Sequence, residues 1–347
     1  MRPLFTLLLA AAISPGADPA KSIEELGGSV ERDASGRAIA ATLAFEWHTD
    51  LDLKHVLELR HVERLDLSLS LITDSGMERL AALPKVKELK LYAVERMTDA
   101  ALTYIAGWKH LERLDLRGTD ITDTALRYIS GLTTLRSLDI SFTQVTNSGM
   151  EHLGGLRNLE ELQLGGNQLT GSGLHVLKLL PKLTALSLRG NQKRNTGIWT
   201  IAITDLDLEA IAALGQLRSL DLRGIRVTDL SASHLRKLTK LESLDLGATR
   251  ISGAGLEQLA ALPALRRLDL WNAKGVDDKA AAALASMKQL ATLDLTDTSI
   301  GDTGLAALTA MPNLRAVFLT GTKVTAEGVA RFRASRADRR VEWVALP

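Results

Sequence analysis

The sequence predicts an α/β solenoid, in which the chain coils so that short strands form one parallel sheet and short helices form a second layer. The first observation is that a Leu-x-Leu string recurs at a nearly constant interval. The second is that the apolar spacing within each interval changes from every second residue to every third or fourth, which indicates a strand followed by a helix. The third is that no single unit can bury its own apolar residues, so neighbouring units must stack. We therefore expect one elongated domain.

The first apolar residue of each string marks one repeat. These markers lie at positions 43, 65, 89, 114, 138, 162, 186, 220, 244, 268, 293, 317 and 344. Seven of the twelve intervals between them are 24 residues long, and two are 25 residues long. We therefore expect about thirteen strands, with the repeats occupying residues 39–326.

Within a repeat the pattern is Leu-x-x-Leu-x-Leu, a few polar or small residues, Ile-Thr-Asp, and then Gly-Leu-x-x-Leu-x-x-Leu. The alternating part predicts a strand, and the later part predicts a short helix. In seven repeats an aspartate or asparagine stands just before the helical part, and we expect its side chain to accept hydrogen bonds from the first free amides of that helix. This helix-start row consists of Asp74, Asp99, Asp123, Asn147, Asp205, Asp229 and Asp302.

The two ends of the chain depart from the repeat. Residues 1–20 contain a basic residue, an apolar run and small residues, which predicts a secretory signal peptide. Residues 21–38 and 327–347 predict terminal caps, because an open end of a solenoid would expose its core. In the first cap we expect a helix over 22–26 and a hairpin over 29–45, and in the second a helix over 327–336 followed by a strand over 341–344. After residue 20, no stretch is long and apolar enough to span a membrane.

On these motifs the chain resembles the leucine-rich repeat family, in the 24-residue form of exported bacterial proteins. The turn after each strand supports the resemblance, since it carries Thr119, Thr143, Thr249, Thr298 and Thr322, or the asparagines Asn167 and Asn191. Ile225 and Ala273 depart from that pattern. The resemblance implies a horseshoe or right-handed superhelix, with the sheet on the concave face and the helices on the convex face. It also implies binding of protein partners.

Composition excludes several classes of function. Lys+Arg is 42 and Asp+Glu is 41, so the net charge of +1 argues against nucleic-acid binding. The absence of cysteine excludes disulfide frameworks, thiolate metal sites and cysteine nucleophiles. The sequence contains none of the common hydrolase, phosphate-loop, zinc-protease or dinucleotide motifs. We therefore expect no enzyme, no cofactor and no metal site, and we expect the seven histidines to be solvated side chains on helix faces.

Aspartates recur on the concave face, because strand alternation directs the residue between the two strand leucines to that face. This sheet-face row consists of Asp66, Asp115, Asp139, Asp221, Asp245, Asp269 and Asp294. The last four belong to consecutive repeats, so their carboxylates stand about 5 Å apart and repel by roughly 3 kcal/mol at an effective dielectric of 20. Flanking arginines and hydrogen bonds should neutralise the row, or the row could attract a basic peptide or a cation. A calcium site at Asp294, Asp297 and Asp302 is a further alternative.

Aromatic and arginine side chains on the same face are the other candidates, because such residues dominate interface hot spots. Trp47 and Phe318 are outward-facing aromatic residues as well, but they lie beside the caps and are therefore left out of the predicted binding residues. One repeat has ten extra residues, 191–200, whose Ile198-Trp199 tip either docks a partner or folds back onto the solenoid. The predicted partner-binding residues are Tyr92, Arg117, Phe142, Arg189, Trp199, Arg223, Asp245, Asp269, Trp271 and Asp294.

These observations predict a non-enzymatic, monomeric scaffold that binds a protein or peptide on its concave face. A signal peptide would place it outside the cell, in the periplasm or in the cell envelope. The alternative is a structural or carbohydrate-binding protein of the envelope that uses tryptophan and aspartate on the same face. An enzyme-associated role is a third possibility, but the repeats leave no room for a catalytic domain.

Overall fold

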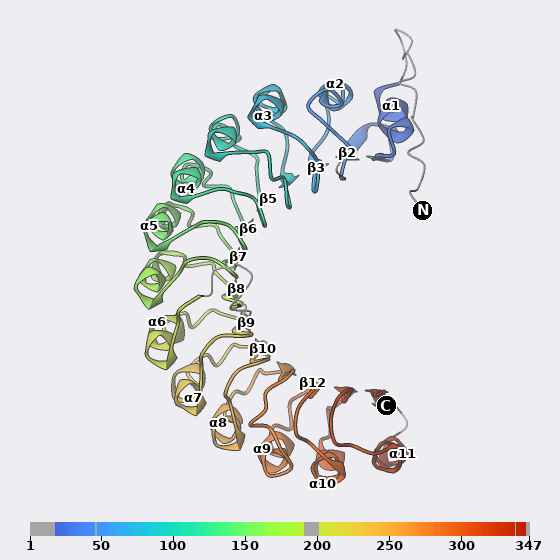
Figure 1. The fold of residues 1–347 in the computed structure, drawn as a ribbon, viewed down its shortest axis with the longest axis vertical. Coiled ribbons are helices and arrows are strands. Elements are labelled where there is room, and N and C mark those ends of the chain that lie inside the picture. Colours follow the sequence, from blue (N-terminus) through green and yellow to red (C-terminus); the bar gives the residue numbers. More distant parts are fainter. Residues whose placement is uncertain (1–17, 46, 191–200, 337, 345–347) are drawn as a thin grey trace, which may run out of the picture.

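The computed structural model describes residues 18–45, 47–190, 201–336 and 338–344. These residues form one curved stack, with the strands along its inner side and the helices along its outer side (Figure 1). Within the described residues, fourteen strands form a single sheet in sequence order, and every neighbouring pair after the first is parallel. The predicted α/β solenoid is therefore confirmed.

The strands are short and regularly placed. They are β1 Ser29–Arg32, β2 Ala38–Thr42, β3 Arg64–Asp66, β4 Glu88–Lys90, β5 Arg113–Asp115, β6 Ser137–Asp139, β7 Glu161–Gln163, β8 Ala185–Ser187, β9 Ser219–Asp221, β10 Ser243–Asp245, β11 Arg267–Asp269, β12 Thr292–Asp294, β13 Ala316–Phe318 and β14 Arg340–Glu342. Leu186 of β8 pairs with Leu220 of β9. The ten extra residues of that repeat therefore leave the sheet register intact.

The outer layer mixes α-helices with 3₁₀-helices. The α-helices are α1 Pro19–Glu25, α2 Leu53–Leu57, α3 Asp74–Leu80, α4 Asp123–Ile129, α5 Asn147–Met150, α6 Leu208–Ala212, α7 Asp229–Leu235, α8 Gly253–Leu259, α9 Ala280–Ser286, α10 Asp302–Ala307 and α11 Ala326–Ser335. The 3₁₀-helices are η1 Asp99–Thr103, η2 Glu151–Gly155, η3 Gly171–Leu179, η4 Asp205–Asp207 and η5 Leu308–Ala310. Across the described residues, no helix is long and apolar enough to cross a membrane.

The strand register corrects the two ends of the predicted repeat. Ala41 pairs with Leu65, and Val341 pairs with Val317. The first and last repeat markers therefore lie at 41 and 341, not at 43 and 344, and both terminal intervals become 24 residues. The leucine pattern missed these positions because alanine and valine occupy them.

A continuous core lies between the sheet and the helices. The leucines in and directly after the strands point inward, as with Leu114 and Leu116, which are 2% and 0% exposed. Burial of a leucine side chain is worth about 2 kcal/mol, so the repeated leucines supply most of the stabilisation. At the turn position, Thr119 donates through Oγ1 to the carbonyl of Leu116 at 2.6 Å, whereas Ile225 and Ala273 fill the same place with buried apolar side chains.

The helix-start row binds the next repeat, which corrects the predicted capping role. Asp123 Oδ1 accepts from the backbone N–H of Thr146 at 2.7 Å, and its Oδ2 accepts from the Thr146 hydroxyl at 2.6 Å. Several helices are capped instead by the preceding threonine, as where Thr146 Oγ1 accepts from the N–H of Ser148, whereas α10 follows Gly301 and has no side-chain cap. The same two-oxygen contact to the next repeat is made by Asp50, Asp74, Asp99, Asp205, Asp229 and Asp302.

The ends of the solenoid are closed by short elements. At the N-terminal end, α1 precedes the antiparallel pair β1 and β2, and β2 is already the first strand of the parallel ladder. At the C-terminal end, α11 and β14 cover the last repeat. Arg339 is buried there and donates to the carbonyl oxygens of Thr309 and Met311, both at 2.8 Å. Its guanidinium thus satisfies carbonyls at the end of the stack.

Candidate functional site

The sheet-face row uses one oxygen of each carboxylate within its own repeat. Oδ1 of every aspartate in the row accepts from the backbone N–H two residues later, at 2.8–3.0 Å. This bond stabilises the turn that follows the strand. The second oxygen is left for contacts across the sheet, and in Asp221, Asp245 and Asp269 it binds Ser187 or Arg223.

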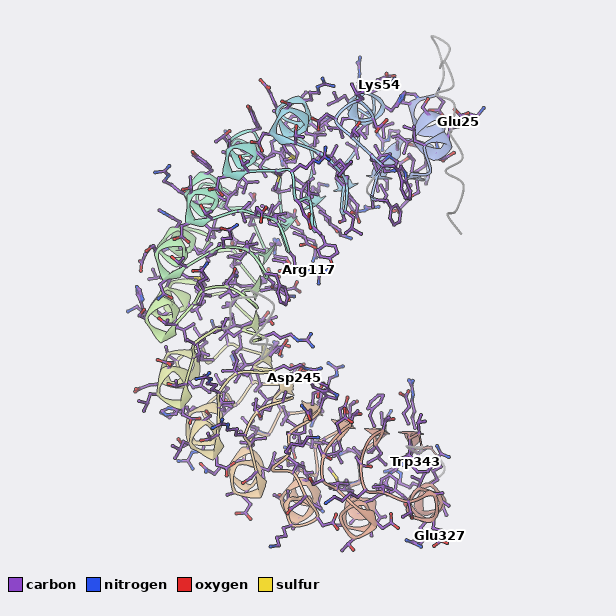
Figure 2. All side chains as sticks on the ribbon, in the orientation of Figure 1. Glu25, Lys54, Arg117, Asp245, Glu327 and Trp343 are labelled. Atoms are coloured by element: carbon purple, nitrogen blue, oxygen red, sulfur yellow. The ribbon has the colours of Figure 1, made fainter. Side chains whose placement is uncertain are left out.

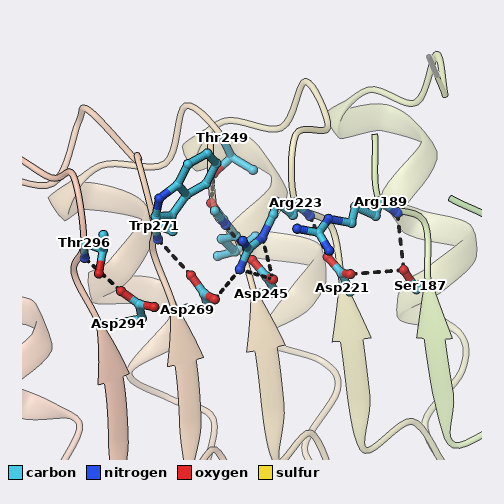
Figure 3. Close-up of polar contacts among 12 residues, drawn as sticks. Ser187, Arg189, Asp221, Arg223, Asp245, Thr249, Asp269, Trp271, Asp294 and Thr296 are labelled. Atoms are coloured by element: carbon cyan, nitrogen blue, oxygen red, sulfur yellow. Dashed lines mark hydrogen bonds and ion pairs between the residues drawn. The ribbon is translucent and has the colours of Figure 1, made fainter. Parts of the chain in front are cut away.

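Arg223 ties the C-terminal part of this row together (Figure 3). Its Nε donates to Oδ2 of Asp245 at 2.9 Å, and its Nη2 pairs with Oδ2 of Asp269. The guanidinium also lies over the ring of Trp271, 5.3 Å from the centroid. The three charged side chains are only about one-fifth exposed. One arginine thus serves two carboxylates, and this half of the row keeps an excess of negative charge.

Asp221 and Arg189 extend the cluster toward the middle of the solenoid. The Ser187 hydroxyl donates to Asp221 Oδ2 at 3.1 Å, and the Arg189 guanidinium lies beside that carboxylate (Figure 3). At the other end, Asp294 accepts from the backbone N–H of Thr296 at 2.8 Å.

Burial shifts the pKa values of this cluster. It raises the pKa of Asp269 to about 6, and the negative charge of Asp245 adds to the rise. Burial also raises the pKa of Asp115 and of Asp221. Burial alone would lower the pKa of Arg223, but its hydrogen bond to Asp245 and the surrounding carboxylates raise it. Mild acid therefore removes a negative charge at Asp269 while Arg223 stays positive.

A second group lies in the N-terminal half of the concave face. The Arg117 guanidinium lies over the Tyr92 ring, 4.2 Å from its centroid, and Arg117 reaches into the opening of the horseshoe (Figure 2). The Arg117 Nε atom is buried and has no hydrogen-bond partner among the described residues. A cation–π pair of this kind is worth about 0.5–1 kcal/mol at a partly exposed site. It offers a partner an aromatic ring with a fixed positive charge.

Phe142 stands apart from both groups. It follows β6 with φ of 57° and is 40% exposed. A left-handed backbone costs a bulky residue roughly 1–2 kcal/mol. The Phe142 ring lies against Gly166 of the next repeat, where a Cβ atom would stand 2.4 Å from the ring. Gly166 is therefore needed for the placement of this exposed ring.

The structure thus divides the predicted site residues. Arg189, Arg223, Asp245, Asp269, Trp271 and Asp294 lie along one run of consecutive strands, whereas Tyr92 and Arg117 form a separate pair and Phe142 lies between them along the chain. Trp199 lies outside the described residues. The flanking-arginine prediction was partly wrong, because the Arg223 guanidinium pairs with the two following aspartates and not with Asp221.

Two exposed apolar features were not predicted. Phe45 stacks on Trp47 with ring centroids 5.1 Å apart at the N-terminal end. Leu206 and Leu230 are 83% and 70% exposed at the starts of neighbouring helices. The sequence could have revealed these two exposed leucines. Each directly follows the aspartate that starts a helix, a position that other repeats fill with a small or polar residue such as Ser75 or Thr303.

The histidine prediction and the calcium alternative are also corrected. His48 and His55 are buried rather than solvated, and burial lowers the pKa of each. Over the residues that the structure describes, no group of three or more histidine or acidic side chains could hold a metal ion. The calcium alternative is wrong, because both Asp302 oxygens bind Thr325.

Comparison with known proteins shows one kind of similarity. A family model described as "Leucine rich repeat" matches residues 133–192 and 215–272. A second model of the same description matches residues 58–81, 109–130 and 290–308. Together the two cover just over half of the chain. No curated protein matches the sequence significantly.

Solved structures share the solenoid. An internalin (inlF) from Listeria monocytogenes is 21% identical with a TM-score of 0.60, and the match covers 95% of this chain and 96% of that chain. A leucine-rich repeat protein from Leptospira interrogans is 17% identical with a TM-score of 0.51, and the match covers 83% of this chain and 74% of that chain. At these identities the likeness concerns the fold.

Proposed function

The chain belongs to the leucine-rich repeat proteins, and on that premise we propose that it is a non-enzymatic scaffold that binds a protein or peptide partner on its concave face. Repeat proteins of this architecture typically mediate protein–protein interaction. The sheet supplies a rigid surface, because the hydrophobic core and the helix-start row fix each strand against the next. The helices on the outer side leave the inner side of the sheet open (Figure 1).

The observation that carries the proposal is the cluster around Arg223. This cluster combines an aromatic ring with partly dehydrated charged groups on the open face of the sheet. Its members are Arg223, Asp245, Asp269 and Trp271. Partly dehydrated charges gain more from a complementary partner than fully solvated charges do. Trp and Arg are also the residue types that most often carry binding energy at protein interfaces. We propose Tyr92 with Arg117, together with Phe142, as a second contact region on the same face, and Trp199 as a contact from the insertion.

A carbohydrate-binding or structural role in the cell envelope is the second candidate. Sugar rings bind by stacking on exposed aromatic faces, and Arg223 already occupies one face of the Trp271 ring. The geometry therefore favours a protein partner over a glycan.

We further propose that the protein is exported as a monomer. The start of α1 favours cleavage of the signal peptide after residue 17 over cleavage after residue 20. Asp18 Oδ1 accepts from the N–H of Ala20 at 3.1 Å and caps α1, and Ala20 is fully buried. N-terminal sequencing of the exported protein should therefore find Asp18 as its first residue. A mature chain that begins with Met1 would contradict export by this route.

The binding proposal is tested by photo-cross-linking from two positions in one repeat. Thr296 follows β12 on the concave side, and Thr303 is exposed on α10 on the outer side. A photoreactive residue at each position, in cells that naturally produce the protein, provides a matched pair. We expect a protein adduct from position 296 and none from position 303. Equal adducts from both positions, or no adduct from position 296, would contradict the proposal.

A further inference from the structure

A cavity of about 310 Å³ lies at the amino ends of β9–β12, beside the sheet-face row. Three arginines line it, namely Arg218, Arg266 and Arg267, together with Glu242. The small residues Ser219, Ser243, Ala291 and Thr292 complete the lining. None of these residues belongs to the cluster around Arg223.

The cavity carries uncompensated positive charge. Glu242 is engaged by Arg218 in an ion pair. The Arg266 guanidinium donates to the carbonyl oxygen of Gln289 at 3.2 Å and forms no ion pair with another described residue. Arg267 is exposed and makes no side-chain hydrogen bond or ion pair within the described ranges. Two guanidinium groups therefore face this space without a carboxylate.

At the same edge of the sheet in the N-terminal half, two of the basic residues that precede strands are paired with carboxylates. Lys87 pairs with Glu63 at 2.8 Å, and Arg136 pairs with Glu160 at 2.6 Å. These residues precede their strands just as Arg218, Glu242 and Arg266 do. Free positive charge at the cavity is thus a local feature of the repeats from β9 to β12 and not a property of every repeat.

The groups around the cavity are chiefly hydrogen-bond donors. Guanidinium groups donate in a planar fork that matches a carboxylate, and the hydroxyls of Ser219, Ser243 and Thr292 can also donate. Across the part of the chain that the structure describes, these hydroxyls have no side-chain hydrogen bond. An acceptor with a single negative charge therefore fits the cavity.

The neighbouring aspartates determine what kind of molecule can carry that acceptor. Each strand continues from the cavity to the sheet-face row, as from Arg267 to Asp269, and alternate residues of a strand are about 6.6 Å apart. A polyanion such as nucleic acid or a sulfated glycan would be repelled by that row. A protein segment with an acidic and a basic side chain about 7 Å apart would meet opposite charges at both places.

We propose that this cavity is a carboxylate subsite, which receives an Asp or Glu side chain of the protein partner while the sheet-face row receives a Lys or Arg side chain. This inference rests on the proposed function and specifies the chemistry of its partner. The alternating spacing matches a partner segment in extended conformation that runs along the strand direction.

The test uses the peptide acetyl-Ala-Glu-Ala-Lys-Ala-amide as a probe, with the Nε–H signals of the arginines followed by NMR. We expect saturable shifts of the Arg267 signal, and about fivefold weaker binding to the Arg267→Gln variant, the loss expected for one exposed charge pair of about 1 kcal/mol. Arg113→Gln is the matched control, because Arg113 opens β5 as Arg267 opens β11 and is exposed as well. Its affinity for the peptide should equal that of the wild type.

Two further probes complete the test. The peptide with Gln in place of Glu should leave the Arg267 signal unshifted, and a heparin oligosaccharide should bind more weakly than the charged peptide. Equal shifts with the Gln peptide, unchanged affinity in Arg267→Gln, tighter binding of heparin, or no shift up to the solubility limit would each overturn the subsite. If the adduct from position 296 persists in that case, the concave binding site stands and only the subsite is wrong.

Discussion

Two rows of aspartates repeat along this solenoid, and they use their carboxylates differently. In the helix-start row both oxygens bind the next repeat, as where Asp123 binds Thr146. In the sheet-face row one oxygen binds the turn of its own repeat, as where Asp139 binds Ser141, and the other faces the concave side. The first row holds repeats together, whereas the second leaves acceptors for a partner. Residue type and repeat position alone do not distinguish these roles, but hydrogen-bond partners do.

The pKa of Asp302 in the first row is shifted in the opposite direction from those of three aspartates in the second row. Hydrogen bonds from the backbone and side chain of Thr325 lower the pKa of Asp302 in the helix-start row. Burial raises the pKa of Asp115, Asp221 and Asp269 in the sheet-face row. A carboxylate that is fully hydrogen-bonded favours its charged form, and a carboxylate buried among others disfavours it. The charged form of Asp302 thus contributes to stability at neutral pH, whereas Asp115, Asp221 and Asp269 keep their charge at a cost in stability.

The largest expected effect is on stability in the helix-start row. Asp123→Ala removes two hydrogen bonds between repeats, and bonds to a charged group are worth about 1.5–3 kcal/mol each. We expect the free energy of unfolding to fall by about 3 kcal/mol in urea titrations. Asp139→Ala is the matched control from the sheet-face row and removes one such bond, so it should lose about half as much, about 1.5 kcal/mol. Equal losses in the two variants would remove the distinction between the rows.

The pH dependence of stability should have opposite signs in the two rows. Between about pH 4 and pH 6, folded Asp269 holds a proton that the unfolded chain has lost, so its contribution to stability falls as the pH rises through this window. The expected decrease is about 1–3 kcal/mol. Asp269→Asn should abolish this part of the slope in unfolding titrations at a series of pH values. Asp302 should show the reverse, with stability lost as the pH falls below its ordinary pKa.

Affinity for the partner should change when residues of the concave face are substituted, and not when residues of the helix-start row are. Arg223→Gln combined with Trp271→Ala removes the bridge between the two carboxylates and the ring beneath it. We expect at least about tenfold weaker binding, or about 1.4 kcal/mol, measured with the partner captured from position 296. The free energy of unfolding should change by less than about 1 kcal/mol, because both side chains lie outside the hydrophobic core. Unchanged affinity would remove this cluster from the binding site.

The smallest expected effect is a change in the pKa of one carboxyl group, that of Asp269. Arg223 stabilises the charged form of Asp269, so Arg223→Gln should raise the pKa of Asp269 above its value of about 6. Carboxyl ¹³C NMR on labelled protein measures this directly. A pKa that falls, or stays the same, would show that Arg223 does not stabilise the Asp269 carboxylate.

Sequence reasoning predicted the solenoid because leucine spacing reports the repeat directly. It missed the end repeats, where Ala41 and Val341 replace leucine but still occupy the same position in the ladder. It placed both aspartate rows but assigned the helix-start row to helix capping. In the structure, Asp123 of this row binds Thr146, which lies 23 residues later in the sequence. The two residues meet only because consecutive repeats stack side by side. The Arg223 bridge was missed for a similar reason, since a long side chain can reach either neighbouring strand.

The most direct test of the account measures stability and binding on the same two variants, Asp229→Asn from the helix-start row and Asp269→Asn from the sheet-face row. We expect Asp229→Asn to lower the free energy of unfolding while the folded protein binds its partner with wild-type affinity. We expect Asp269→Asn to weaken binding severalfold without loss of stability at pH 7. Loss of stability in Asp269→Asn with unchanged affinity would contradict the claim that the concave row serves recognition.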